Sequence, residues 1–164
     1  MPVISDEFWQ AIEGSSLATF VKDAVWAYPA LETVHIIGLG LLFGAIIAFD
    51  LRVLGLNKSL PLSQLGRHLL PWVWTGFALN ATSGVLLFAS DALEFSSNPA
   101  LWAKLSLIVL AGVNALYFQA RIMPSATAWE ANTATPTRAR LSAMLSMTLW
   151  LAIIVAGRMI AYVK

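Results

Sequence analysis

Residues 31–54 read LETVHIIGLGLLFGAIIAFDLRVL, a nearly continuous apolar run. An α-helix needs about 20 residues to cross about 30 Å of hydrocarbon, and this run is long enough. Three further runs of similar length follow, at residues 69–90, 101–120 and 141–163. The sequence therefore predicts an all-α integral membrane protein in which residues 31–164 form a four-helix transmembrane bundle.

The composition supports a membrane protein. Of the 164 residues, 59% are hydrophobic and 12% are charged. A soluble domain of this size could not bury so much apolar surface, so the lipid bilayer is the first expected partner. The formal net charge of +1 gives no indication of nucleic-acid binding. The chain has no cysteine, which excludes disulfides, iron–sulfur clusters and thiol catalysis.

Residues 1–30 predict short helices that lie in the membrane interface on the periplasmic side. Ser5 can cap a helix that Gly14 ends, and one of the two serines after Gly14 can start a second helix that Pro29 closes. An arm that binds a partner protein is the alternative interpretation. The segment contains the aromatic residues typical of a membrane interface, Trp9, Trp26 and Tyr28.

The loop charges predict the orientation of the bundle. The loops after the first and third spans are basic, whereas the opposite side carries most of the acidic residues. The positive-inside rule therefore places both basic loops in the cytoplasm and both termini in the periplasm. The basic residues of these loops are Arg52, Lys58, Arg67, Arg121, Arg138 and Arg140.

Small and polar residues inside the spans predict contacts between helices. Gly40 and Gly44 form a GxxxG motif, which permits close helix packing either within the bundle or in a dimer. Asn80 and Asn114 lie near the middles of the second and third spans, so we expect an interhelical hydrogen bond between them.

Asp50 lies near the cytoplasmic end of the first span. We expect its carboxylate to pair with Arg67 or Arg121 from a neighbouring element. Such a pair would be a structural link rather than a site.

His35 is the strongest candidate for a functional residue. It lies about one turn inside the first span, and Glu32 at i−3 projects from the same helix face. An ionisable residue at membrane depth is a functional candidate by default. A neutral imidazole can bind iron or copper, with a carboxylate orienting the ring through its second nitrogen. The structural alternative is a headgroup-level histidine that only bonds Glu32.

His68 is the second of the two histidines. It lies near the cytoplasmic headgroups, about 20–25 Å from His35 along the membrane normal, and an interfacial role is expected. Two ligands of one iron must bring their nitrogens within about 4 Å, so the two histidines are not expected to share one haem within a protomer. A separate site at His68 would draw on methionines of the same level, Met123, Met144 and Met147.

The fourth span returns Met159 and Arg158 to the level of His35. This arrangement predicts an iron site with His35 and Met159 as ligands and Arg158 on a haem propionate. Copper handling through His35, Glu32 and Met159 is a further interpretation. A di-iron bundle would need a second Glu-x-x-His pattern, and the chain has none.

Several strings resemble a family of small, functionally uncharacterised, four-span bacterial membrane proteins. They are Glu32-x-x-His35-x-x-Gly38, Asp50-Leu-Arg52-x-Leu-Gly55, Pro71-Trp-x-Trp74-x-Gly76-Phe77 and Asn98-Pro99-x-x-x-x-Lys104. This resemblance implies the four-span architecture and a bacterial inner membrane, but no established activity. More loosely, the chain is similar to copper-resistance D and cytochrome b561-like proteins, and the latter bind haem b between four helices. Its two histidines do not form the two pairs at matched depth of the b561 pattern.

The sequence thus favours a haem-b-binding subunit for electron transport, with His35 as the metal ligand near the periplasmic face. A cofactor-free accessory subunit, in a homo-oligomer or a larger membrane complex, is the alternative. Copper handling is the third hypothesis for the function. An electron-transfer or accessory role is expected rather than a stand-alone enzyme.

Overall fold

The computed structural model describes residues 5–129 and 134–163, and this part of the chain contains helices and no strand. Four helices are long and apolar enough to cross a membrane, which confirms the predicted architecture. These four spans are α3 (Ala27–Leu54), α4 (Leu62–Ser90), α6 (Pro99–Tyr117) with its π-helical and 3-10 extensions η1 (Phe118–Ile122) and η2 (Met123–Ala128), and α7 (Thr137–Met159).

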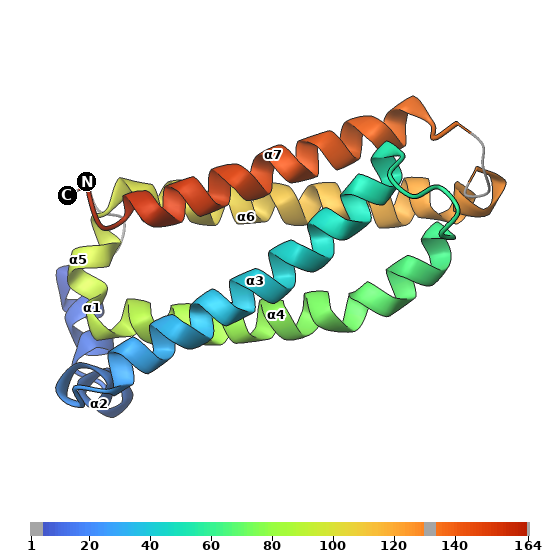
Figure 1. The fold of residues 1–164 in the computed structure, drawn as a ribbon. Helices are drawn as coiled ribbons and strands as arrows, with labels where there is room; N and C mark the ends of the chain where they lie inside the picture. Colours follow the sequence, from blue (N-terminus) through green and yellow to red (C-terminus); the bar gives the residue numbers. More distant parts are fainter. Residues whose placement is uncertain (1–4, 130–133, 164) are drawn as a thin grey trace.

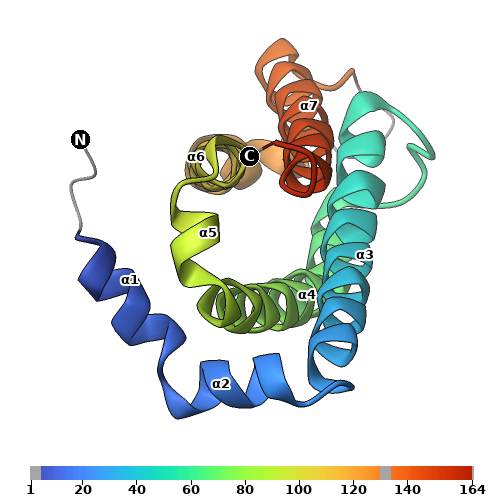
Figure 2. The ribbon, with the colours of Figure 1, turned by 90° about the vertical axis from the view of Figure 1, so that its left-hand side faces the viewer.

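The spans form two antiparallel hairpins, α3–α4 and α6–α7 (Figure 1). The hairpins meet through α3 and α7, whereas α4 and α6 scarcely touch each other. The view along the bundle shows the short helix α5 (Ala92–Ser96) joining α4 to α6 (Figure 2). We call this end of the bundle the α5 end, and the opposite end, with the α3–α4 connection, the loop end.

The N-terminal segment folds into α1 (Asp6–Glu13) and α2 (Ser16–Asp23), which lie across the α5 end (Figure 2). Gly14 follows α1 as predicted, and the Ser15 hydroxyl caps α2 by accepting a backbone N–H. The prediction that Pro29 closes this segment is wrong, because α3 already begins at Ala27. Proline is tolerated in a first helical turn, where its missing N–H has no intrahelical acceptor.

Other span limits also differ from the prediction: the third span runs from Pro99 to Ala128 rather than over 101–120, and the fourth starts at Thr137 rather than at residue 141. The second span starts at Leu62 rather than at residue 69, and Leu62 is completely buried in the core at the loop end. The fourth span ends at Met159 rather than at residue 163. There the buried Asn98 amide donates to the carbonyls of Ile160 (3.0 Å) and Val163 (2.7 Å), which ties the start of α6 to the end of α7.

α3 and α4 approach each other closely at Gly38 and Gly76. A Cβ atom on Gly38 would lie 2.7 Å from the Asn80 nitrogen, and one on Gly76 would lie 2.6 Å from the Leu42 nitrogen. Only glycine fits such backbone contacts, since real Cβ atoms do not come so close. This crossing holds the α3–α4 hairpin together and fixes how α3 side chains face α4.

Gly40 and Gly44 take no part in packing among the described residues. Both are exposed, and a Cβ atom on either would have no atom of another element within 4 Å. Of the two expectations for the GxxxG motif, close packing within the bundle is therefore wrong. The dimer expectation stays a prediction, because this face of α3 is open.

Candidate functional site

His35 is half-buried on α3 and its ring faces α4. Its Nδ1 atom lies 3.0 Å from the Ser83 hydroxyl oxygen. Gly84 makes room for the ring, because a Cβ atom there would lie 3.0 Å from His35 Cε1. The Asn80 side-chain amide also donates to the His35 carbonyl oxygen at 2.9 Å. The imidazole is thus positioned by one face of α4.

The Ser83 hydroxyl lies within hydrogen-bond distance of His35 Nδ1 and of two carbonyl oxygens of α4, those of Leu79 and Asn80. The Ser83 hydroxyl donates to the Leu79 carbonyl oxygen at 2.6 Å, one turn earlier on α4. When its proton is donated to that carbonyl, the Ser83 oxygen accepts the Nδ1–H of the Nδ1-protonated His35 tautomer. The Nε2 atom then carries a free lone pair, which is the form of histidine that binds a metal.

Lys104 brings a positive charge to the same half of the bundle. Its side chain packs against Gly157 of α7. A Cβ atom added to Gly157 would lie 3.6 Å from each of the Lys104 atoms Cδ, Cε and Nζ. The ammonium group is close enough to His35 for an electrostatic interaction. No hydrogen bond or ion pair of Lys104 occurs in the part of the chain that the structure describes. An intramembrane cation without an acceptor suits an anionic ligand.

The other residues predicted near His35 make no hydrogen bond with it among the described residues. Glu32 is exposed, and the hydrogen-bonding partner of His35 Nδ1 is Ser83 rather than Glu32. Arg158 donates to the Tyr162 hydroxyl at 2.6 Å and lies over its ring. Met159 is 42% exposed. Within residues 5–129 and 134–163, no group of three or more histidine and acidic side chains could hold a metal ion.

His68 lies far from His35, at the loop end. It is exposed on α4 and precedes Ser83, the partner of His35, by about 15 residues, which corresponds to about 22 Å of helix. This separation agrees with the distance expected from the sequence. One protomer therefore cannot place both histidines on the same iron.

Asn80 and Asn114 each bond a neighbouring helix, but the predicted bond between them is wrong. Asn80 bonds α3, as described above, whereas Asn114 exchanges two hydrogen bonds with Ser142 of α7, at 3.0 and 2.8 Å. The reason is the arrangement of the hairpins, since α4 and α6 are not packed together. Each asparagine instead strengthens its own hairpin.

The charged residues at the end of α3 are also used differently from the prediction. Asp50 faces Ser146 of α7, and the arginines expected to pair with it, Arg67 and Arg121, are exposed. Arg52 is buried and donates to the carbonyls of Leu60 (2.6 Å) and Lys58 (3.2 Å). Arg52 therefore closes the loop between α3 and α4.

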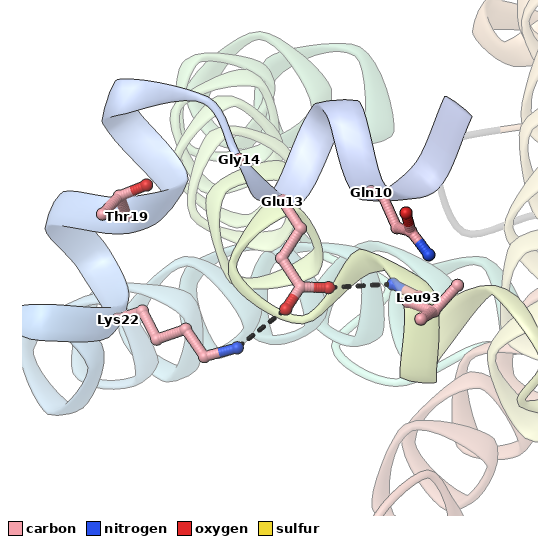
Figure 3. A pocket seen from close by; sticks show the side chains of 6 residues that line it. All are labelled: Gln10, Glu13, Gly14, Thr19, Lys22 and Leu93. Carbon is pink, nitrogen blue, oxygen red and sulfur yellow. Dashed lines mark hydrogen bonds and ion pairs between the residues drawn. The ribbon is translucent and has the colours of Figure 1, made fainter. Parts of the chain in front are cut away.

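A pocket of about 320 Å³ lies outside the spans, between α1, α2 and α5 (Figure 3). Lys22 Nζ lies 2.7 Å from Glu13 and 3.2 Å from Asp91, and Glu13 also accepts the Leu93 N–H at 3.4 Å. These contacts attach the N-terminal helices to the rest of the protein. Each group is partly in water, so the pocket is better described as a structural junction than as a site.

The N-terminal junction is expected to weaken at both extremes of pH. The hydrogen bond from Lys22 holds the pKa of Glu13 below its ordinary 4.5, and that from Glu13 holds the pKa of Lys22 above its ordinary 10.5. The stabilisation by Glu13 is present above pH 4.5 and is lost as the pH falls through its lowered pKa. That by Lys22 is present below pH 10.5 and is lost as the pH rises through its raised pKa.

Amide hydrogen exchange of α1 measures this attachment. At neutral pH we expect faster exchange of residues 6–13 in Lys22→Ala than in the natural protein, because both ion pairs are lost. Asp23→Ala, at the neighbouring exposed position, is the control and should leave the exchange unchanged. Equal exchange in all three proteins would show that other contacts hold α1.

The family of this chain follows from a comparison with family models. A model described as a family of unknown function, DUF6644, matches residues 8–163. The chain belongs to this family. No curated protein and no solved structure matches it. Membership in DUF6644 confirms the predicted relation to an uncharacterised family, while the looser similarity to b561-like and copper-resistance D proteins finds no support among these comparisons.

The strings that carried the resemblance occupy definite positions in this DUF6644 protein. Gly38 and Gly76 form the α3–α4 crossing, and Gly55 ends α3 with a φ of 115°, a conformation that favours glycine. Asn98 caps α6, and Lys104 packs against Gly157 of α7. Lys104 is a cation inside an apolar span, a sequence signal that marks a functional candidate. Ser83 was missed, because no sequence pattern aligns it with His35.

Proposed function

We propose that this protein is a haem-b-binding subunit for electron transfer in a bacterial inner membrane, with His35 as an axial ligand. The observation that carries the proposal is the hydrogen bond between His35 Nδ1 and Ser83, because it leaves Nε2 free for iron. One histidine is a sufficient protein ligand for haem iron, as in globins. The unpaired ammonium group of Lys104 suits a propionate carboxylate.

His35, Ser83 and Lys104 support this proposal as an iron ligand, its orienting partner and a cation for a propionate. When bound, haem b would supply a one-electron iron couple. Ser83 would orient the His35 imidazole, and Gly84 leaves space for this imidazole on α4. Lys104 would neutralise the charge of a haem propionate. Met159 as a second axial ligand stays a prediction. Arg158 is engaged by Tyr162, so Lys104 is the better partner for a propionate.

The visible spectrum of the purified protein tests this function. After expression with ample haem, we expect a Soret band and about one haem per chain. A second preparation, made without added haem and titrated with haem in detergent, should give the same band. Absence of the band in both preparations would rule out haem binding.

A cofactor-free accessory subunit is the second candidate, and the open Gly40–Gly44 face of α3 favours it. Small residues allow a helix from another protein or a second copy to approach closely. The mass of the purified protein in mild detergent tests this role. It should exceed that of one chain and fall to one chain in Gly44→Leu. A monomer in both cases would contradict it.

Both termini are proposed to lie in the periplasm. Reporter fusions after Lys164 and within the loop at Lys58 measure this orientation, because alkaline phosphatase is active only outside the cytoplasm. The positive-inside rule predicts activity for the fusion at Lys164 and none for that at Lys58. The reverse pattern would invert the orientation and move His35 to the cytoplasmic side.

A further inference from the structure

Asp50 is a carboxyl group buried within the bundle. It lies about one turn before the end of α3 and is only 6% exposed. One carboxyl oxygen, Oδ2, has no hydrogen-bond partner among the described residues. The Ser146 hydroxyl of α7 is its polar contact. A buried polar atom without a partner calls for an explanation, and inside a membrane it marks a functional candidate.

The surroundings of Asp50 are apolar on both helices. Its neighbours on α3, Phe49 and Val53, belong to or pack against the core at the loop end. On α7, Ala139 and Ala143 are 0% and 1% exposed, because small residues let α3 and α7 come together there. Asp50 therefore lies at the contact that joins the two hairpins.

No charged side chain of the described residues forms an ion pair with Asp50. Arg52 points to the carbonyl groups of the α3–α4 loop. The other ionisable groups of the elements around Asp50 are exposed, namely Arg67 and His68 of α4, Arg121 of η1, and Arg138 and Arg140 of α7. The carboxyl group must therefore be neutralised by something other than the side chains around it.

A proton is the species that fits. An ionised carboxylate without a partner is strongly disfavoured in an apolar interior, and such a group becomes neutral instead. A hard cation such as Ca²⁺ needs at least about six oxygen ligands. The hydroxyl group of Ser142 and the amide of Asn114 already bond each other, so they do not complete a cation site. We propose that Asp50 is a proton-binding site, which holds a neutral carboxylic acid between α3 and α7 at neutral pH.

This assignment links proton release to the contact between the hairpins. Loss of the proton would place a negative charge at Oδ2, where no donor from the described residues meets it. Water or a cation must then enter, which requires α3 and α7 to separate at the loop end. The site does not depend on haem binding, because it lies at the opposite end of the bundle from His35.

Infrared spectroscopy of the purified protein in D₂O tests the proposal. A protonated carboxyl group has a carbonyl band above the amide and carboxylate bands. We expect this band at neutral pH, its loss in Asp50→Asn, and its persistence in Glu32→Gln, where an exposed carboxylate is removed. Absence of the band, or its persistence in Asp50→Asn, would overturn the proposal.

Two further measurements keep the test decisive if Asp50→Asn does not fold. In Ser146→Ala the acid is retained and loses the neighbouring hydroxyl group, so the band should move to higher frequency. Sodium, potassium or calcium chloride should leave the band of the natural protein unchanged. An unshifted band in Ser146→Ala would assign it to another group, and a band removed by one of these salts would show a cation site instead of a proton site.

Discussion

Gly76→Ala is expected to destabilise the protein by about 1–3 kcal/mol, which is typical of overpacking a close contact. The added methyl group would lie 2.6 Å from the Leu42 nitrogen and 2.8 Å from the Gly38 carbonyl oxygen. Both are backbone atoms, so no side chain can rotate away and α4 must shift from α3. The free energy of unfolding, from SDS titration in mild detergent, measures the effect.

Gly40→Ala and Gly44→Ala, on the facing span α3, are the matched controls. Nothing of another element lies within 4 Å of either methyl position in the described structure. Alanine is also the better helix former, so these variants should be neutral or more stable by up to about 1 kcal/mol. If Gly40→Ala destabilised the protein as much as Gly76→Ala does, the assignment of the close crossing to Gly38 and Gly76 would be incorrect.

His35→Ala is expected to abolish haem binding, because it removes the proposed ligand. His68→Ala should leave binding intact, since His68 lies about 22 Å farther along the helices. Haem titration followed at the Soret band compares the two variants. Equal and complete loss in both would mean that His68 reaches the iron from a second protomer.

Two milder variants show which residue orients the His35 imidazole. Ser83→Ala should weaken binding by about 10–100-fold, the usual effect of removing the partner that orients a histidine ligand. The sequence alone gave this role to Glu32, but Ser83 makes the hydrogen bond, so Glu32→Gln should have little effect. A large loss in Glu32→Gln with none in Ser83→Ala would restore the original assignment.

The sequence by itself determined the number of spans, the short helices before them and the uncharacterised family. Four apolar runs must each cross the bilayer, whatever their neighbours are. The end of α1 at Gly14 and the cap of α2 at Ser15 depend only on residues next to them. The limit predicted at Pro29 was wrong because a proline was read as a helix boundary, and the second span begins at Leu62, about two turns before the predicted residue 69. The chain continues as a helix through Pro29.

The tertiary structure decided which residues meet. The GxxxG motif drew attention to Gly40 and Gly44, but the close crossing uses Gly38 and Gly76, whose contact depends on how α3 and α4 are rotated about their axes. The partners of Asn114 and Asp50 are serines on α7. A hydrophobic run fixes the depth of a residue in the membrane but not the direction in which it points. That direction follows from side-chain packing between helices, because lipid covers every apolar face of a helix equally well.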